Sequence, residues 1–299
     1  WKGGGQVKRQ RVETVAELQA RGVVAITKAQ MAGALQISVR SLNGMMARGE
    51  VSYFQIGPRL VRFSVEDAVN RMRQEFVANV SHELRIPLTS LTGYAETLLE
   101  GGLDDAENRE SFVRIIRDQA VRLHQLVADL LALAEVERPD AQLRLEPLDL
   151  RALMLRQAAA LRDTATRNGI ALSVLEGEPV WIEGDRVRLE QVAANLLDNA
   201  VKYTEQGSVL VRIGESDGRA WCEVSDTGPG IPDEDQRRIF ERFYRVDKAR
   251  SREKGGTGLG LSIVKHVVAL HRGEVSVTSR LGEGTTFRFE LPIKPSLTR

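Results

Sequence analysis

The stretch Phe76-Val-Ala-Asn-Val-Ser-His82-Glu-Leu-Arg-Ile-Pro87-Leu decides how the first half of the sequence folds. Its apolar residues continue a pattern of alternating steps of three and four, which predicts one long helix with a coiled-coil-like seam. At about 100° per helical residue, His82 lies about 200° from the seam residues Val80 and Leu84. The imidazole is therefore predicted to face solvent. A lone exposed histidine is usually ordinary surface, so its neighbours decide whether it has a chemical role.

Two neighbours favour such a role. Glu83 can hold or deprotonate one ring nitrogen of His82, so that the other nitrogen becomes nucleophilic. Pro87 has no N–H to donate to the carbonyl of Glu83, so we expect the helix to bend or loosen beside the histidine. The segment is typical of a histidine that acts as a nucleophile.

The long helix is predicted to begin after Ser64, its N-cap, and to stop at Gly101-Gly102. A second helix with the same apolar spacing runs from about Ala106 to just before Pro139. Two antiparallel helices with one apolar face each leave much of that face bare. We therefore expect two chains to form a four-helix bundle, which predicts a homodimer.

The sequence before and after these helices predicts two further domains. In front, Thr27 is a candidate N-cap for a helix over 29–35, and a second helix (38–46) and two strands (51–56 and 59–63) follow, the layout of a winged helix-turn-helix. Behind, helices mixed with alternating strands at 209–213, 220–224, 275–278 and 286–291 predict an α+β sandwich. The predicted organisation is a tail (1–21), a winged helix-turn-helix-like module (22–69), a helical-hairpin bundle (70–138), a hinge (139–147), the sandwich (148–294) and a tail (295–299).

Three polar residues in the sandwich, Asn195, Asn199 and Lys202, are spaced i, i+4 and i+7 and share one helix face. A solvated face is one interpretation. Asparagine is a poor helix former, however, and two asparagines with a lysine suit a site for Mg²⁺ and phosphate. Mg²⁺ prefers oxygen ligands, many of them from phosphate and water, and Asn195 is the predicted protein ligand.

Two glycine clusters follow, Asp226-Thr-Gly228-Pro-Gly230-Ile and Gly255-Gly256-Thr-Gly258-Leu-Gly260-Leu. Glycines let backbone N–H groups approach phosphates closely, and the second cluster opens into a helix whose N-terminus favours an anion. The sequence has no Gly-Lys-Ser/Thr P-loop and no dinucleotide fingerprint after an early strand. The charged segment 231–254 between the clusters, with Phe240-Glu-Arg-Phe-Tyr-Arg245, fits a mobile lid.

Six segments, taken in chain order, resemble the H, N, G1, F, G2 and G3 boxes of sensor histidine kinases of two-component systems. They are the His82 segment, the Asn195 segment, Asp226-Thr-Gly-Pro-Gly-Ile, Phe240-Glu-Arg-Phe-Tyr-Arg, Gly256-Thr-Gly-Leu-Gly-Leu and Gly282-Glu-Gly-Thr-Thr-Phe. The resemblance covers about residues 72–294. It implies a dimerization and histidine-phosphotransfer bundle followed by a Bergerat-type ATP-binding domain. ATP and Mg²⁺ would be bound, and the partner would be the receiver domain of a response regulator.

By position, the resemblance implies that His82 is the phosphoacceptor, Glu83 the base and Asn195 the Mg²⁺ ligand. One position departs from the family pattern. Four residues after the histidine the family usually has Thr or Asn, which is thought to orient the water that dephosphorylates the partner. Ile86 stands there and cannot form a hydrogen bond. We expect autokinase and phosphotransfer activity with weak phosphatase activity.

The same resemblance assigns the nucleotide site. Asn199 and Lys202 would lie near the phosphates, Tyr203 would line the pocket, and Asp226 would accept a hydrogen bond from the adenine amino group. Arg245 would reach the γ-phosphate. The rest of the predicted site consists of Gly228, Gly230, Gly256, Gly258, Gly260 and Leu261.

The front segment resembles excisionase-like and MerR-like winged modules over about 45 residues. Residues 1–73 carry 12 Lys/Arg against 5 Asp/Glu, a net charge of +7 in a chain of +1, which favours a nucleic-acid partner. The predicted DNA contacts are Arg40, Asn43, Arg59 and Arg62. The alternative, of equal weight, is a module that only dimerizes or holds the kinase helices together. Its place before the phosphoacceptor helix indicates an engineered fusion, and a natural DNA-linked kinase is the alternative.

Composition adds two expectations. The single cysteine, Cys222, excludes an intramolecular disulfide and fits a reducing compartment, and no apolar run is long enough for a membrane helix. A soluble cytoplasmic chain is expected, although a native parent could be membrane-anchored.

Two rival functions are a Bergerat-fold ATPase of the chaperone or topoisomerase kind, and a DNA-binding regulator whose kinase half is a scaffold without ATP turnover.

Overall fold

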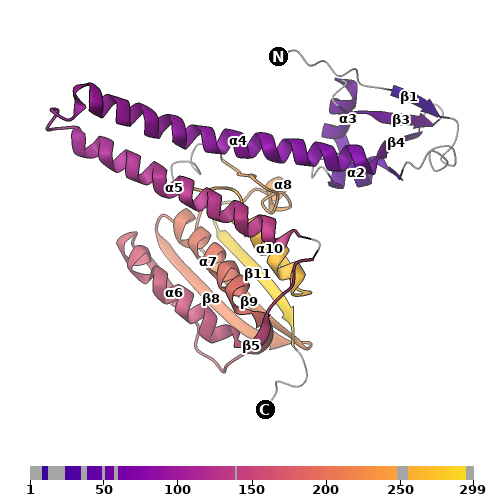
Figure 1. The fold of residues 1–299 in the computed structure, drawn as a ribbon. Helices are drawn as coiled ribbons and strands as arrows, with labels where there is room; N and C mark the ends of the chain where they lie inside the picture. Colours follow the sequence, from indigo (N-terminus) through magenta and orange to yellow (C-terminus); the bar gives the residue numbers. More distant parts are fainter. Residues whose placement is uncertain are drawn as a thin grey trace. The chain divides into compact units, whose positions relative to one another are not determined.

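The computed structural model of the protein describes residues 9–12, 24–34, 39–48, 51–56, 60–138, 140–247 and 255–293. The chain divides into two compact units, residues 1–86 and 87–299. The division falls inside the long helix α4 (Val65–Thr97) (Figure 1). Each unit has a hydrophobic core of its own.

The first unit confirms the short elements predicted before the long helix. Helices α2 (Lys28–Ala34) and α3 (Val39–Ala47) are followed by strands β3 (Tyr53–Ile56) and β4 (Leu60–Ser64), all within two residues of their predicted bounds. Strand β3 pairs antiparallel with β4, as a hairpin requires. Strand β2 (Ala25–Ile26) adds to the other edge of β4.

Strand β1 (Arg9–Val12) was not predicted, because the sequence analysis placed residues 1–21 in a tail. It pairs in parallel with β3, which gives a four-stranded sheet in the order β1-β3-β4-β2. The four residues Arg-Gln-Arg-Val show no apolar alternation, and their partner lies more than forty positions further along the chain. A strand defined only by such a distant partner has no local sequence signal.

Two helices begin at the N-cap residues predicted for them. The Thr27 hydroxyl oxygen accepts from the backbone N–H of Gln30 at 3.2 Å, and the Gln30 side chain accepts from the N–H of Thr27 at 2.9 Å. This reciprocal pair is a capping box, and it confirms Thr27 as the N-cap of α2. At the start of α4, the Ser64 hydroxyl oxygen accepts from the N–H of Asp67 at 3.4 Å.

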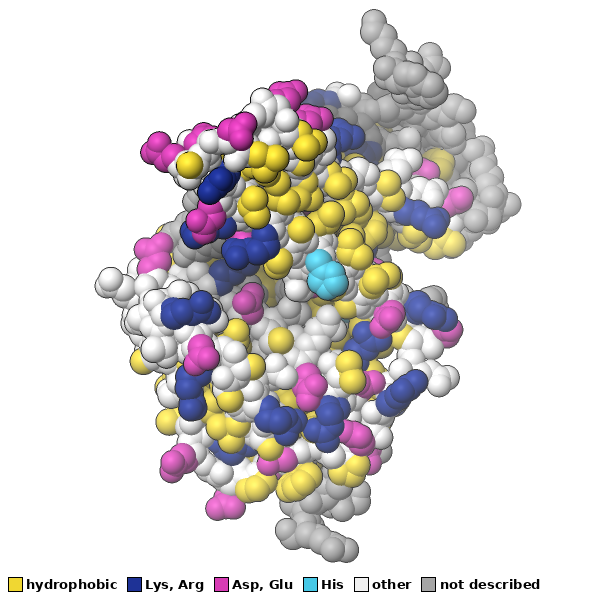
Figure 2. Space-filling model, turned by 60° about the vertical axis from the view of Figure 1, so that its left-hand side comes forward, with side chains coloured by type: hydrophobic (Ala, Val, Ile, Leu, Met, Phe, Trp, Pro, Cys, Tyr) yellow, Lys and Arg dark blue, Asp and Glu magenta, His cyan; other side chains and the backbone are white. Residues whose placement is uncertain are grey.

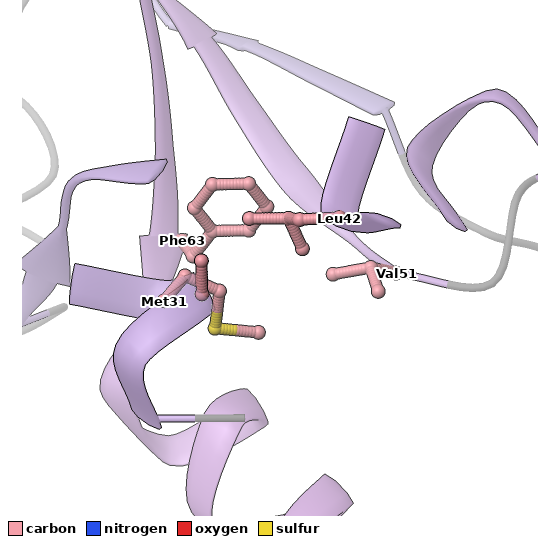
Figure 3. Close-up of a cluster of buried hydrophobic side chains, with 5 residues drawn as sticks. Met31, Leu42, Val51 and Phe63 are labelled. Atoms are coloured by element: carbon pink, nitrogen blue, oxygen red, sulfur yellow. The ribbon is translucent and has the colours of Figure 1, made fainter. Parts of the chain in front are cut away.

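The core of the first unit is small and entirely apolar. Met31, Leu42, Val51 and Phe63 are buried at 2% exposure or less, and their side chains converge between the helices and the hairpin (Figure 3). Met72 of α4 packs against the same cluster. The first turns of α4 are therefore part of this core, because removing them would expose apolar surface.

A helical hairpin opens the second unit. Helix α4 is uninterrupted through Pro87, so the bend predicted there stays a prediction. After a π-helical turn, η1 (Leu98–Gly102), where Gly101 has a φ of 123°, the chain returns in α5 (Arg109–Val136). The stops predicted at Gly101-Gly102 and before Pro139 are confirmed.

Large apolar side chains on this hairpin face outward (Figure 2). Among the described residues, they are exposed by between 43% and 80%. Contiguous apolar surface of this kind indicates a surface that another protein covers. These outward-facing side chains are Leu88, Leu99, Leu103, Val113, Val127 and Leu131, whereas Val121, also exposed, lines a cavity of the second unit.

The rest of the second unit is the predicted α+β sandwich. A five-stranded sheet in the order β10-β11-β9-β8-β6 is covered on one face by α6, α7 and α10 (Figure 1). Strand β6 pairs in parallel with β8, and the other neighbours are antiparallel. The sheet consists of β6 (Ile170–Val174), β8 (Gly207–Ser216), β9 (Arg219–Asp226), β10 (Glu274–Arg280) and β11 (Gly284–Pro292), with α6 (Leu150–Arg167), α7 (Arg186–Tyr203) and α10 (Gly260–Leu270) above it.

Smaller elements complete the sandwich. Strands β5 (Leu145–Asp149) and β7 (Trp181–Asp185) form a separate antiparallel pair, and the short helix α8 (Asp233–Gln236) follows β9. Cys222 in β9 is fully buried, and burial raises the pKa of its thiol far above the ordinary range. The cysteine therefore behaves as a small core side chain. No helix in the described part of the chain is both long and apolar enough to cross a membrane.

A buried histidine joins two of the covering helices. At the end of α10, the Nδ1–H of His271 donates to the carbonyl of Val267 at 2.8 Å. Its Nε2 accepts from the backbone N–H of Asp185, the N-cap of α7, at 3.0 Å. An imidazolium has no acceptor nitrogen, so this arrangement requires the neutral ring. Burial lowers the pKa of His271, and the nearby Asp185 carboxylate opposes that shift.

We therefore expect the sandwich to lose stability as the pH falls below about 6.5, the ordinary pKa of histidine in an unfolded chain. The folded-state pKa of His271 is lower, so the unfolded chain binds the proton first and protonation favours unfolding. Urea unfolding at about pH 7.5 and about pH 5.5 would measure this. Fluorescence is a suitable signal, because Trp181 and Trp221 both lie in the sandwich.

His271→Gln should lose less stability than the wild-type protein across that pH window, since glutamine cannot take up the proton. His124→Gln, at an exposed histidine of α5, should keep the wild-type dependence. The same loss in wild type and His271→Gln would contradict the assignment.

Candidate functional site

A cavity of about 830 Å³ lies within the second unit, between α5, α6, α7 and the loops that follow β9 and precede α10. All but one of the residues predicted to bind nucleotide or metal line it. They are Asn195, Asn199, Lys202, Tyr203, Asp226, Gly230, Arg245, Gly256, Gly258, Gly260 and Leu261.

Helix α7 supplies the polar wall of this cavity. Asn195, Asn199 and Lys202 face the cavity, while Val192 and Leu196 are fully buried on the other side. The side-chain nitrogen of Asn195 is buried and has no hydrogen-bond partner among the described residues. A buried polar atom in that state is costly unless a ligand satisfies it.

Charges of both signs gather around Lys202. Burial lowers the pKa of Lys202, while the carboxylate of Asp198 raises it and the guanidinium groups of Arg245 and Arg122 lower it. A cavity with three cationic side chains near one helix face suits an anionic ligand.

Asp226 ends strand β9 at the opposite part of the cavity. Its carboxylate accepts from the backbone N–H of Gly228 at 2.8 Å, and burial raises its pKa. Gly228 is the one predicted residue that does not line the cavity. A Cβ at Gly228 would lie 2.8 Å from the Asp226 carboxylate and 3.2 Å from the Tyr203 carbonyl oxygen. Gly228 therefore helps to hold Asp226 in place, and its own contact with a ligand stays a prediction.

Two glycines of the second cluster permit close approaches. Gly258 has a φ of +74°, and a Cβ there would lie 2.9 Å from the backbone of Phe243, whose N–H donates to the Gly258 carbonyl at 2.8 Å. A Cβ at Gly260 would lie 3.2 Å from the side-chain oxygen of Asn195. The glycines thus join three predicted motifs around one cavity, as a phosphate-binding loop requires.

Helix α5 contributes residues that sequence reasoning missed. Asp118, Arg122, Gln125 and Asp129 line the cavity, although α5 was predicted only as a bundle helix. Asp129 is 5% exposed, and its carboxylate accepts from the hydroxyl of Thr257 at 2.6 Å. The sequence near Asp129 carried no signal of this contact, because its partner Thr257 lies 128 positions further along the chain.

The predicted phosphoacceptor lies in the first unit. The side chain of His82 is 62% exposed, which confirms that it faces solvent. Its Nδ1 lies 4.0 Å from the Glu83 carboxylate, close enough for charge attraction and too far for a hydrogen bond. Ile86 lies one helical turn further along α4.

The structure describes three of the four predicted DNA-contact residues. Arg40 and Asn43 are exposed on α3. Arg62, on β4, donates to the carbonyl of Val61 at 3.0 Å. Arg59 lies outside the described residues. The assignment of these side chains to DNA stays a prediction.

No cluster of three or more His, Cys, Asp or Glu side chains suited to a metal ion occurs in the described ranges. A metal ion in this cavity would therefore depend on few protein ligands. Mg²⁺ behaves in this way, since it keeps water and takes phosphate oxygens with one or two protein groups. The amide oxygen of Asn195 fits that pattern.

Comparison with known proteins agrees with this geometry. Residues 184–295 match the family model of histidine kinase-, DNA gyrase B- and HSP90-like ATPases, and residues 72–139 match that of the His Kinase A phospho-acceptor domain. The fold and cavity thus define an ATPase domain of this class preceded by a phospho-acceptor domain. The chain belongs to the two-component sensor histidine kinases. A Bergerat-fold ATPase alone is not favoured, because it would not explain residues 72–139.

Two curated relatives are similar over most of the chain. The circadian input-output histidine kinase CikA of Synechococcus elongatus is 35% identical over 275 residues, 90% of this chain and 36% of CikA. The sensor histidine kinase WalK of Bacillus subtilis is 36% identical over 232 residues, 77% of this chain and 38% of WalK. The chain thus spans less than two fifths of either relative. The crystal structure of full-length ShkA in complex with AMPPNP matches with a TM-score of 0.53 and 36% identity, over 73% of this chain and 45% of ShkA.

Gly258→Ala should weaken adenine-nucleotide binding by about tenfold or more, because the added Cβ forces the loop away from Phe243. Gly255→Ala is the matched control. Gly255 also has a positive φ, of +72°, but no atom of the described residues lies within 4 Å of an added Cβ. Titration with a fluorescent adenine nucleotide measures both. Equal losses would mean that backbone strain matters and the close approach does not.

Proposed function

We propose that the chain is an ATP-dependent protein-histidine autokinase that phosphorylates His82 and passes the phosphoryl group to an aspartate of a response-regulator receiver domain. The observation that carries this proposal is the combination of a solvent-exposed histidine in a phospho-acceptor domain with the polar cavity of an ATPase domain. An ATPase or a scaffold would need only one of these features.

The chemistry follows from the position of Glu83. Its carboxylate faces Nδ1 of His82, which favours the tautomer with the proton on Nδ1 and leaves the lone pair on Nε2. Nε2 attacks the γ-phosphorus, the N–P bond forms, and the bond to the β,γ-bridging oxygen breaks to release ADP. Glu83 takes the Nδ1 proton. In the second step, the N–P bond breaks as a receiver aspartate oxygen bonds to phosphorus, and Glu83 returns the proton to Nδ1 of His82.

The cavity residues take the remaining roles. Asn195 holds Mg²⁺, which when bound neutralises phosphate charge. Asn199 and Lys202 bind phosphate oxygens, with Arg245 toward the γ-phosphate. The Asp226 carboxylate accepts from the adenine amino group, and Tyr203 lines the adenine pocket. The buried, unpaired amide nitrogen of Asn195 supports a hydrogen-bond acceptor of a ligand at this point of the cavity, and the close-packed glycines support phosphate groups beside the loop.

The bundle helices form a homodimer in this proposal. The exposed apolar side chains of the hairpin are the surface that a second chain covers, giving a four-helix bundle. Burial of this stripe is the driving force for association.

The first unit is proposed to carry a winged helix-turn-helix-like module over residues 22–69. Two short helices and a hairpin around a common core support this proposal, as do the exposed Arg40 and Asn43 on the second helix. DNA binding through these residues and dimerization without DNA are its two possible functions. The remaining boundaries are proposed as predicted, with a hinge at 139–147 between bundle and sandwich.

The test of the autokinase is transfer of γ-labelled phosphate from Mg-ATP to the purified protein. We expect label that survives alkali and is lost in acid, the behaviour of phosphohistidine. His82→Ala should remove it. His124→Ala, at another exposed histidine, should keep it. Label that persists in His82→Ala, or tight ATP binding without any label, would overturn the proposal.

Ile86→Thr should raise the rate at which the protein dephosphorylates a phosphorylated receiver domain, because the added hydroxyl can orient a water molecule. Ile86→Val is the matched control, since valine has the shape of threonine without its hydroxyl. Both variants should keep the autophosphorylation rate. The measurement is loss of phosphoryl label from the receiver domain, and unchanged loss with Ile86→Thr would refute this explanation.

A further inference from the structure

Asp129 is the most deeply buried carboxylate contributed by α5, and both of its oxygens are engaged. One accepts from the side-chain amide of Gln125 at 2.7 Å, and the other accepts from the Thr257 hydroxyl at 2.6 Å. Thr257 also accepts from the backbone N–H of Leu259 at 3.2 Å, so its own proton is directed to Asp129. The contact therefore ties α5 to the loop that immediately precedes α10.

That loop is where the anionic part of a ligand is expected. It holds Gly256 and Gly258, and it opens into α10, whose N-terminus is electropositive. Lys202 lies close enough to Asp129 for the two charges to affect each other's pKa values. The Asp129 carboxylate thus shares the cations and the loop that phosphate groups would use.

The other charged groups near Asp129 do not remove the repulsion between its carboxylate and a phosphate group. Asp198, on α7, adds a second negative charge and raises the pKa of Asp129, although burial is the largest cause of that shift. Arg122 on α5 and Arg245 act on Lys202 from within the same cavity. A bound triphosphate would add further negative charge beside both carboxylates, and like charges in a site of low dielectric repel strongly.

Further contacts fix α5 against the same domain. Glu137, the C-cap of α5, pairs with Arg242 at 2.6 Å and lies 3.3 Å from Nε2 of His266 on α10. Glu135 pairs with Arg188 of α7 at 2.7 Å. Asp129 is therefore held at the cavity by several contacts.

We propose that Asp129 is an affinity-determining residue of the nucleotide site, contributed by the bundle helix α5. Its carboxylate holds the glycine-rich loop through Thr257 and opposes the phosphate groups of the nucleotide. Nucleotide binds more tightly when this charge is removed. The inference rests on the proposed nucleotide-binding function, and it gives the bundle helix a residue that sets nucleotide affinity.

The experiment is calorimetric titration of the full chain with Mg-AMPPNP. Asp129→Asn keeps the shape of the side chain and an acceptor for Thr257 but removes the charge, and it should bind about tenfold more tightly than wild type near pH 8. Asp129→Glu keeps the charge and should show no gain. Glu110→Gln is the control for total charge, since Glu110 is exposed near the start of the same helix and pairs with Arg114.

The pH dependence separates charge from packing. The advantage of Asp129→Asn over wild type should shrink as the pH is lowered, because protonation of Asp129 then gives the wild-type protein the same neutral side chain. If Asp129→Asn is poorly folded, Asp129→Ser provides a second neutral variant for the same comparison.

Each outcome decides the question. Equal or weaker binding by the neutral variants, with normal binding by wild type, overturns the role of Asp129 and leaves the proposed function intact. A gain that does not change with pH, or that Asp129→Glu shares, also overturns it, since packing would then be the cause. Failure of the wild-type protein to bind Mg-AMPPNP at all overturns the proposed function, and with it this inference.

Discussion

Helix α7 has one face that must be buried against the sheet and one that must face the cavity. The rest of the sandwich fixes the rotation of α7 about its own axis that satisfies both. Leu189 and Leu196 must stay buried under the sheet, while Asn195 and Lys202 must face the cavity. A rotation of one residue, about 100°, would bury the amide and ammonium groups among apolar side chains, at a cost of several kcal/mol. Asp185 holds the helix start in this rotation, since its carboxylate accepts from the N–H groups of Arg188 and Arg144.

Helix α5 completes the cavity that α7 begins. Burial of a carboxylate such as that of Asp129 costs several kcal/mol unless hydrogen bonds replace water. Gln125 and Thr257 provide those hydrogen bonds. The helix therefore has an exposed apolar surface and a polar surface that lines the cavity of the ATPase domain. In the proposed function these two surfaces link the bundle to the nucleotide.

The features that sequence predicted were those with a local cause. Thr27 capped its helix because the capping box needs only residues within one turn, and the strands of the sandwich alternate between apolar and polar residues. The glycine clusters marked the cavity because close backbone approaches exclude a Cβ. Strand β1 and the role of Asp129 depend on partners far along the chain, and a single sequence does not specify such pairs.

Pro87 lies where the chain divides into its two compact units. Proline has no N–H to donate to the carbonyl of Glu83, so the turn of α4 that follows His82 has one intrahelical hydrogen bond fewer. The compact units separate at this residue, between Ile86 and Pro87. In the proposed function, His82 approaches a nucleotide for one step and a receiver aspartate for the next. A bend in this turn would leave both hydrophobic cores intact, since the Met72 contact and the sandwich lie on opposite sides of it in the chain.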